Sequence, residues 1–358
     1  MTMDFQQAKS LKEMIQNHSR AGNLSLYSEA QERGLTLTEL LEEMDPSPRN
    51  DTGEISAELD AFERQLYLNG VISSGNSAIT MEQFFLGSGL ILIPEYILRE
   101  IRRGYTMVQD PSELIAASVP VKGPTVKPIY IKTTEAQKSL AERSEGASYP
   151  AVNLLYRDKE ANILDRGRRF DFSYRVAKNQ KLAEFRVFLW WIGAQMAYDE
   201  IDEIYSIIIN GDGTSPAATD VFDGTPGTFD YSDLVTLTMS FDVPSRMTHV
   251  LGTKEDIKVI LNMTEFKDAK AWAANELYQR TGKLQSLMPV NSKLVIAPNA
   301  TSTKFAALDH RFAIRESVAQ PLMIEAEKVI SQKLESAVVS KESVYTNMVD
   351  EAVYVSDY

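Results

Sequence analysis

The sequence predicts an α+β protein with more than one domain, and three observations support this fold class. The chain has 358 residues, whereas single hydrophobic cores stop growing at about 250–300 residues. Helical spacing of apolar residues marks most of 1–104 and a long segment at 178–210, while strand-like patterns mark parts of 120–175 and the C-terminal stretch. Because helices and strands occupy separate stretches, we expect an α+β fold.

The composition excludes several classes of protein. Apolar residues make up 44% of the chain and charged residues 24%, as in an ordinary globular protein and unlike a disordered or collagen-like chain. No cysteine is present, so disulfides, cysteine-ligated metals and a thiol nucleophile are excluded. Fifty acidic and 37 basic residues give a net charge of −13, which disfavours tight binding to DNA.

No targeting or membrane signal is visible. The first ten residues are polar and lack the apolar stretch of a secretory signal. The longest apolar run, 187–198, has twelve residues, whereas a helix that spans a membrane needs about 20. We therefore expect a protein of the cytosol that has no membrane partner.

The first 70 residues are acidic and predict short amphipathic helices. They contain thirteen Asp or Glu and six Lys or Arg, a net charge of −7. Helices are expected around 11–15, 37–44 and 59–68, with Thr36 or Thr38 as the cap of the second. DPSPRNDTG, at 45–53, is typical of a linker. Helices this short need another surface against which to bury their apolar faces.

Two further helices are expected before residue 105. A small one lies around 81–85, after a bridge rich in Gly, Ser and Asn. In the next, Pro94 suits the first helical position, Ile97, Leu98 and Ile101 form the apolar stripe, and two arginines occupy the last turn.

Residues 120–175 predict an extended hairpin with a polar tip. The strand-like residues are Val126, Ile129 and Ile131 in the first arm, and Phe170, Phe172 and Tyr174 in the returning arm, where they alternate with polar residues. A two-stranded hairpin is marginally stable alone in water. We therefore expect this one to lie on another surface.

Residues 178–210 predict one long helix. The segment lacks proline and has a single glycine, Gly193, and Asn210 followed by Gly211 ends it. A helix of this length extends about 48 Å, and its apolar residues indicate burial on more than one side. The predicted core residues of this spine helix are Phe185, Phe188, Ile192, Ile201, Ile204, Tyr205 and Ile208.

The remainder of the chain predicts mixed structure after a turn-rich loop at 211–230. MTHVLG and KLVIAP suggest strands at 247–252 and 293–298. Helical spacing marks 254–261 and 269–280, and strands are expected at 323–330, 337–340 and 352–356.

Residues that carry enzymatic chemistry form no known constellation. The histidines, His18, His249 and His310, have no partner at metal-binding spacing, and GxSxG and a complete phosphate-binding loop are missing. The four carboxylates within 199–203 are expected on a solvated or interface flank of the long helix. We predict no catalytic residue, no metal ligand and no cofactor, and a protein that is not an enzyme.

One segment reverses the sign of the charge. Residues 157–181 contain eight Lys or Arg and four Asp or Glu, a net charge of +4. We expect this segment to contact an acidic surface of an adjacent subunit, with the acidic region 1–70 as the first candidate. The predicted inter-subunit contact residues are Arg157, Lys159, Arg166, Arg168, Arg169 and Arg175.

Four segments, in this order, resemble the tailed-bacteriophage major capsid protein family, whose Hong Kong 97-type fold is shared with encapsulins. They are LILIPEYILREI at 90–101, AERSEGASYP at 141–150, FDFSYRVAKNQKL at 170–182 and IIINGDG at 207–213. The resemblance extends over residues 86–358. The sequence departs from the family pattern because no Gly-Pro pair follows INGDG directly.

The resemblance implies a Hong Kong 97-like capsid fold in six segments. These are an N-terminal helical arm at 1–85, an extended β-hairpin loop at 122–171, an axial α/β domain at 231–318, and a peripheral domain with the spine helix, built from 86–121, 172–230 and 319–358. We expect the arm to be retained, so that assembly uses a separate scaffolding protein or none.

The resemblance also implies a structural function. A major capsid protein assembles with itself into pentamers and hexamers, first as a procapsid and then as an icosahedral phage head that encloses double-stranded DNA without sequence-specific contact. Scaffolding, portal and decoration proteins are expected partners, and the virion capsid, assembled in the host bacterial cytoplasm, is the expected location. The alternatives are an encapsulin-type nanocompartment shell, which the long N-terminal region disfavours, a soluble enzyme, and a polymerising surface-layer or tail protein.

Overall fold

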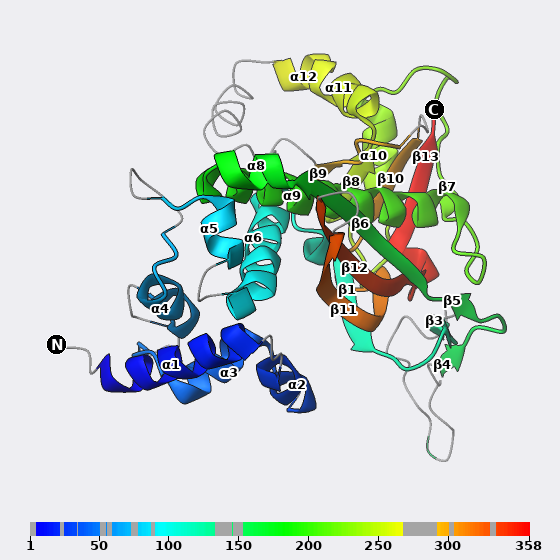
Figure 1. The fold of residues 1–358 in the computed structure, drawn as a ribbon. Helices are drawn as coiled ribbons and strands as arrows, with labels where there is room; N and C mark the ends of the chain where they lie inside the picture. Colours follow the sequence, from blue (N-terminus) through cyan, green and yellow to red (C-terminus); the bar gives the residue numbers. More distant parts are fainter. Residues whose placement is uncertain are drawn as a thin grey trace. The chain divides into compact units, whose positions relative to one another are not determined.

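The computed structural model describes residues 5–21, 25–33, 35–50, 55, 59–72, 78–86, 90–132, 145, 153–267, 292–300, 304–329 and 334–358. The chain forms two compact units. Figure 1 labels its helices and strands. Unit 1 comprises Met1–Met107, Gly167–Ala194 and Met323–Ser340, and unit 2 comprises Val108–Arg166, Gln195–Leu322 and Lys341–Tyr358. The division into six segments implied by the resemblance stays a prediction.

Unit 1 begins with four short helices: α1 (Phe5–Ala21), α2 (Ser25–Glu32), α3 (Leu37–Met44) and α4 (Ala61–Leu68). Thr36 and Asp60 begin α3 and α4 with capping boxes, in which each side-chain oxygen accepts a hydrogen bond from the backbone N–H of a glutamate three residues later. The predicted cap at Thr36 is confirmed. The buried apolar residues of this helical cluster are Ala8, Leu11, Ile15, Leu26, Ala30, Leu37, Leu40, Leu41, Ala61 and Phe62.

Part of the predicted linker at 45–53 is held to this cluster by buried polar contacts with Arg64 of α4. The Arg64 side chain is only 6% exposed, and its Nε donates to Asp45 Oδ2 at 2.9 Å. Its Nη1 donates to Ser47 Oγ at 2.8 Å, and its Nη2 donates to the Asp45 carbonyl oxygen at 2.6 Å. A buried guanidinium is tolerated where several acceptors surround it, so this segment connects α3 to α4 through buried polar contacts.

Side-chain hydrogen bonds join the cluster to the next segment, which contains α5 (Met81–Leu86), the 3₁₀ turn η1 (Leu90–Leu92) and α6 (Ile93–Met107). Tyr27 Oη donates to the Ile91 carbonyl oxygen at 2.7 Å, and Thr38 Oγ1 donates to Glu95 Oε1 at 2.7 Å. The helices at 5–68 therefore bury their apolar faces against one another and against their own unit. This agrees with the expectation that helices this short need another surface against which to pack.

The long helix α9 (Leu182–Asn210) confirms the predicted spine helix, except at its start. A short helix, α8 (Tyr174–Asn179), precedes it, and the chain is not helical at residues 180 and 181. The expected helix from residue 178 is therefore interrupted. Arg175, expected on a strand, lies in α8, because the strand ends at Ser173.

Helices α6 and α9 cross at two glycines within unit 1. A Cβ atom on Gly193 would lie 2.0 Å from the Ile101 carbonyl oxygen, and one on Gly104 would lie 2.2 Å from the Trp190 carbonyl oxygen. Such distances are far below any real van der Waals contact, so the two backbones touch only because both positions lack a side chain. Trp190 Nε1 donates to Glu100 Oε2 at 2.5 Å beside this crossing.

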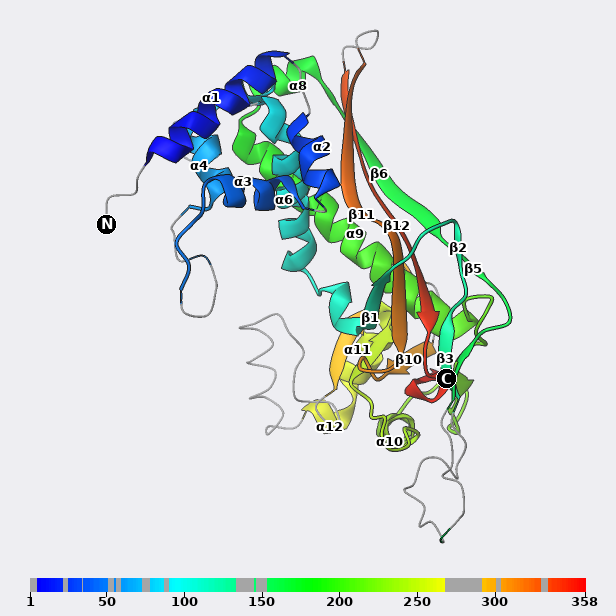
Figure 2. The same ribbon diagram turned by 90° about the horizontal axis from the view of Figure 1, so that it is seen from below.

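A four-stranded sheet has the order β1-β11-β12-β6. Its strands are β1 (Ile115–Pro120), β6 (Leu164–Ser173), β11 (Ile314–Val329) and β12 (Leu334–Asn347), of which β11 and β12 are long ribbons in Figure 2. β1 pairs with β11 in parallel. Both C-terminal strands begin before their predicted starts, since 314–322 and 334–336 also pair in the sheet.

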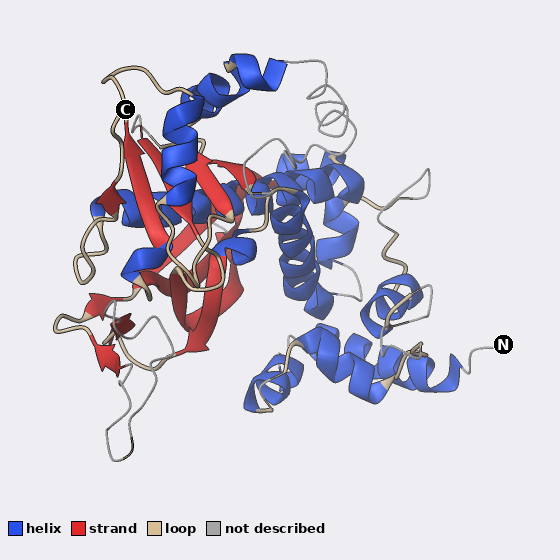
Figure 3. Cartoon of the chain, turned by 180° about the vertical axis from the view of Figure 1, so that it is seen from behind, coloured by secondary structure: helices blue, strands red, loops and turns tan. Residues whose placement is uncertain are grey.

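Unit 2 contains a five-stranded sheet of order β7-β13-β10-β8-β9. The strands are β7 (Thr219–Asp220), β8 (His249–Gly252), β9 (Lys293–Ile296), β10 (Lys304–Leu308) and β13 (Val353–Asp357). Three helices, α10 (Tyr231–Met239), α11 (Lys254–Asn262) and α12 (Thr264–Lys267), lie near this sheet (Figure 3). Two apolar cores fill the unit: one includes Ile201, Ile204 and Tyr345, and the other includes Phe229, Leu237 and Phe305.

Two small antiparallel pairs complete the described strands of unit 2. β2 (Thr125–Val126) pairs with β5 (Ala161–Asn162), and β3 (Ile129–Lys132) pairs with β4 (Asn153–Tyr156). The strand-like residues around 126–131 thus lie in two short strands and not in one. Phe170 and Phe172 of the predicted returning arm lie in β6, which pairs with β12 and not with β2 or β3, and Tyr174 lies in α8. The loop tip at 141–150, apart from residue 145, and the predicted helix at 269–280 lie outside the described residues. Within the described part of the chain, no helix has the length and apolar character that crossing a membrane requires.

Candidate assembly surfaces

The β3–β4 hairpin exposes apolar side chains on both of its faces. Leu154 is 63% exposed, Leu155 39% and Tyr156 66%. Successive residues of a strand point to opposite faces, so β4 carries exposed apolar side chains on both of its faces. Solvent-exposed apolar residues gathered on one element typically mark a contact with another protein.

Two of the predicted basic contact residues are used inside the chain. Arg157 forms an ion pair with Asp350, its guanidinium lies 4.3 Å from the centre of the Tyr130 ring, and its side chain is only 10% exposed. Arg166 pairs with Glu203 and donates through Nη1 to the Ser343 carbonyl oxygen at 2.8 Å. Since both cations already have partners, they contribute less to an external surface than their sequence suggests.

The other four basic residues differ in exposure. Lys159, Arg169 and Arg175 are exposed, and Arg168 is half-buried. Arg169 Nε donates to Asp171 Oδ1 at 2.9 Å across the surface of β6. The structure therefore separates the six residues into an internal pair and an outer group, for which contact with a second subunit stays a prediction.

Six of the seven predicted core residues of α9 are buried, and one is not. The buried ones are Phe185, Ile192, Ile201, Ile204, Tyr205 and Ile208, each at most 3% exposed. Phe188 is 40% exposed, so its assignment to the core is wrong within a single chain. Its ring contacts those of Phe170 and Phe185 on one side, and its helical position leaves the other side open beside Val187 and Trp191, each 56% exposed.

A buried charge network in unit 2 corrects the expectation of a solvated carboxylate flank on α9. Glu200 is 7% exposed, receives hydrogen bonds from Lys341 Nζ at 2.9 Å and Tyr345 Oη at 2.7 Å, and Lys341 also pairs with Glu316 at 2.7 Å. Burial alone would lower the pKa of Lys341, but Glu200 and Glu316 outweigh it and raise that pKa above its usual value. The i, i+4 spacing of residues 196, 200 and 204 could have revealed that Glu200 shares the buried face.

Glu203 has the most altered carboxyl group of this network. Burial raises the pKa of Glu203 to about 7, and the nearby Arg166 offsets only part of that effect. Perturbed carboxyls can mark catalytic sites. Here the neighbours of Glu203 are structural strands and ion pairs, and the described residues contain no cluster of three or more His, Asp or Glu able to hold a metal ion.

Two histidines share one hydroxyl group in the sheet of unit 2. Thr248 Oγ1 lies 3.0 Å from Nδ1 of His249 and 3.0 Å from Nδ1 of His310, and it accepts a hydrogen bond from the His310 backbone N–H at 2.9 Å. His249 is 3% exposed. Burial, followed by the proximity of His310, lowers its pKa to about 4. The two histidines lie where β8 pairs with the end of β10, and their contacts with Thr248 are part of the fold.

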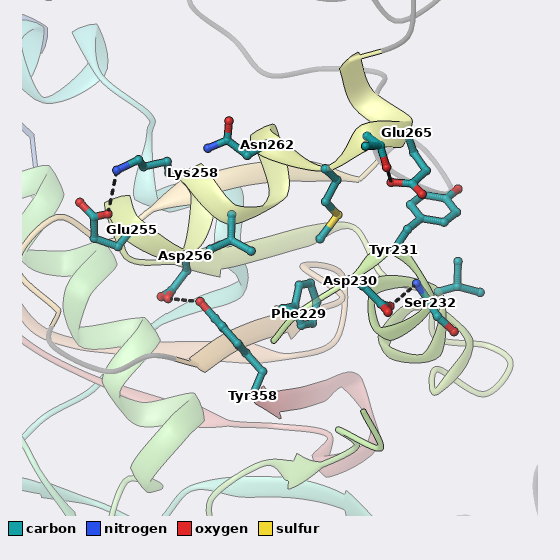
Figure 4. Close-up of a pocket in the computed structure, with 14 residues that line it drawn as sticks. Phe229, Asp230, Tyr231, Ser232, Glu255, Asp256, Lys258, Asn262, Glu265 and Tyr358 are labelled. Atoms are coloured by element: carbon teal, nitrogen blue, oxygen red, sulfur yellow. Dashed lines mark hydrogen bonds and ion pairs between the residues drawn. The ribbon is translucent and has the colours of Figure 1, made fainter. Parts of the chain in front are cut away.

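An open groove lies between α10 and α11 (Figure 4). Its volume is about 980 Å³. Tyr358 Oη donates to Asp256 Oδ1 at 2.8 Å on its floor, and Asp230 accepts hydrogen bonds from the backbone at the start of α10. All of these polar contacts serve the fold, and no nucleophile–base pair is formed by the residues that line this groove.

Comparison with known proteins gives a structural match without a sequence match. No protein-family model and no curated protein matches the sequence. A virus-like particle from Pyrococcus furiosus superposes with a TM-score of 0.50 and 10% identity, over 74% of this chain and 99% of that one. The chain has the Hong Kong 97-type capsid fold.

Two further matches to solved structures have lower scores. A chain of Mycobacterium phage Bobi gives a TM-score of 0.43 with 12% identity, over 69% of this chain and 89% of that one. The holo-SrpI encapsulin complex from Synechococcus elongatus PCC 7942 gives 0.43 with 13% identity, over 68% and 84%. At these identities, structural comparison establishes the capsid fold alone, so the kind of shell is a separate question.

Proposed function

We propose that this chain is a major capsid protein, which assembles with itself into pentamers and hexamers of an icosahedral phage head. The observation that carries the proposal is the β3–β4 hairpin, in which Leu154, Leu155 and Tyr156 of β4 are 39–66% exposed on a chain with a capsid fold. A second copy that covers the hairpin would bury this apolar surface at about 25 cal/mol per Å². A hairpin without such a cover would be marginally stable.

The charge of the chain fits a shell around double-stranded DNA. The net charge of −13 disfavours strong, counterion-releasing contacts with phosphates. A wall of this kind encloses DNA without sequence-specific binding. Scaffolding, portal and decoration proteins are proposed further partners, and assembly in the host bacterial cytoplasm followed by residence in the virion is the proposed location.

An encapsulin-type shell is the second candidate, and the N-terminal region is the observation that bears on it. Residues 5–68 form a folded helical cluster with a buried ion pair, Arg64–Asp45. We infer that this cluster is retained in the assembled particle, where it occupies space that a cargo-holding shell would leave for its enzyme. A non-enzymatic function is proposed in both cases.

Electron microscopy of the purified recombinant chain tests the proposal. Closed icosahedral particles, with or without nucleic acid, are the expected result, and their pentamers and hexamers should be resolved after averaging. Shells that co-purify with an enzyme would favour the encapsulin alternative. A preparation that stays dispersed as monomers at all salt and protein concentrations would contradict shell formation.

A further inference from the structure

The groove between α10 and α11 has the composition of a docking site for an apolar, positively charged segment. Phe229 and Met263 are buried on its floor, and Val235 and Val259 line its walls from the two helices. Three exposed carboxylates, Asp230, Glu255 and Glu265, stand around it against a single lysine, Lys258. Figure 4 shows Phe229 and the four charged residues among the side chains that line this space.

The last residue of α10 and the turn after it, residues 239–244 (the 239–244 turn), expose apolar side chains. Val243 is 82% exposed and Met239 is 74% exposed, the two highest values among the large apolar residues that the structure describes. Arg311 Nη2 donates to the Pro244 carbonyl oxygen at 3.2 Å and pairs with Asp309 at 2.7 Å, which anchors the turn. Arg246, which follows the turn, is exposed, as is Asp242 within it, so Arg246 is the cation beside this apolar turn that has the opposite sign to the groove.

The groove and the 239–244 turn share helix α10. Tyr231, Ser232 and Val235 line the groove, and Met239, one helical turn beyond Val235, is the last residue of the helix. Met239 and Val243 stay 74% and 82% exposed in their own chain, so neither fills its own groove. Two different complementary surfaces on one subunit produce a head-to-tail contact, which generates rings when the rotation closes.

We propose that the 239–244 turn of one copy inserts Val243 and Met239 into the α10–α11 groove of the next copy around a pentamer or hexamer. The inference rests on the proposed function, because it assigns a contact within the rings of that shell. Apolar burial would supply the stabilisation, and the opposite charges of Arg246 and the groove carboxylates would set the register. The occupant is thus a second copy of this chain, with one groove filled per subunit.

The absence of cysteine in the chain allows a disulfide test. Two double variants, Val243→Cys with Val259→Cys and Val243→Cys with Val235→Cys, are purified as particles and oxidised with glutathione disulfide. In the proposed contact, residue 243 of one copy lies against residue 259 or 235 of the next copy, so disulfides can link successive subunits around a ring. At least one of the two double variants should therefore produce a ladder of bands on a non-reducing denaturing gel that ends at five or six subunits. Each single variant should stop at dimers.

A charge test provides a second readout. Val243→Asp places a carboxylate against the acidic groove and should reduce particle yield at least tenfold, whereas Val243→Lys should retain most of it. Leu261→Asp, on α11 but outside the groove, is the matched control, with 38% exposure. Circular dichroism of the subunits checks that all three variants fold.

The outcomes separate this inference from the proposed function. If particles form but neither double variant gives more than dimers, and Val243→Asp assembles like Leu261→Asp, the docking contact is overturned while the capsid function stands. If the unsubstituted chain forms no particles at all, the proposed function fails, and the ring contact fails with it.

Discussion

The N-terminal helical cluster and the β3–β4 hairpin differ in the exposure of their apolar side chains. The cluster buries its apolar residues within unit 1 and closes its polar contacts with Arg64, Asp45 and Ser47. The hairpin leaves Leu154 and Tyr156 more than 60% exposed. The apolar residues of the first region are buried by its own chain, and those of the second are left exposed, where we propose that a second copy covers them. A substitution should therefore affect subunit stability in the first region and assembly in the second.

Removing the Arg64 side chain should destabilise the N-terminal helical cluster and give the largest loss in the free energy of unfolding. Arg64→Ala leaves Asp45 buried without its cation, which should lower the free energy of unfolding by about 3–5 kcal/mol. Urea titration followed by far-ultraviolet circular dichroism measures the loss. Arg33→Ala is the control, because Arg33 is 52% exposed in its pairs with Glu29 and Glu43, and exposed pairs contribute about 0–1 kcal/mol. An equal loss in the free energy of unfolding from Arg64→Ala and Arg33→Ala would contradict a stabilising role of the buried Arg64–Asp45 pair.

Lowering the pH should destabilise the five-stranded sheet of unit 2, because His249 becomes protonated. The pKa of His249 is about 4 in the folded chain and 6.5 ordinarily, so the unfolded chain binds the proton first. Stability is present above pH 6.5 and falls as the pH drops towards 4, by on the order of 3 kcal/mol. His249→Asn should flatten this part of the pH profile, measured by urea unfolding at pH 4 to 7.5. His18→Asn should leave it unchanged, and an unchanged slope in His249→Asn would refute the assignment.

A methyl group at the α6–α9 crossing should have a smaller but still clear effect. Gly193→Ala places a Cβ atom 2.0 Å from the Ile101 carbonyl oxygen, and the overpacking should cost about 1–3 kcal/mol despite the better helix propensity of alanine. The thermal unfolding midpoint checks this. Gln195→Ala, two residues along the same helix, should stay within about 0.5 kcal/mol. A more stable Gly193→Ala protein would show that the helices are not in contact at this glycine.

Changes in the hairpin should barely affect the subunit. Leu154→Ser combined with Tyr156→Ser should alter the free energy of unfolding by less than about 0.5 kcal/mol, because both side chains are exposed. Particle yield by electron microscopy should nevertheless fall strongly, as apolar contact with a second copy is lost. Lys127→Ser, an exposed polar position on the same excursion, should assemble normally. Normal particles from the double variant would contradict the role of the hairpin.

Charge reversal in the outer basic group should give the smallest change in particle assembly. Arg168→Glu with Arg169→Glu should reduce assembly without changing the fold of the subunit, since exposed ion pairs contribute about 0–1 kcal/mol each and mainly set register. Raising the salt concentration should weaken assembly of the unsubstituted chain in the same direction. Full particle yield from this variant would remove the basic segment from the set of contact surfaces.

Local signals in the sequence predicted most of the elements correctly. Thr36 with Glu39 three residues later predicts the start of α3 because the capping box is a local contact. The glycine after Asn210 marks the end of α9 for the same kind of reason. Phe188 and Glu200 were misassigned, since helical spacing gives the faces of a helix but not the depth to which another element covers each face.

The sequence by itself determined the α+β class, the long helix, the strands around it and the lack of cysteine chemistry, because these follow from periodicity, capping and composition. Only the tertiary structure decided which charges are internal, as with Arg157 and Arg166, and which apolar residues stay exposed, as with Val243 and Leu154. The two internal charges depend on contacts between residues far apart in the sequence, 193 positions for Arg157 with Asp350 and 37 for Arg166 with Glu203, whose distance in space no local pattern encodes.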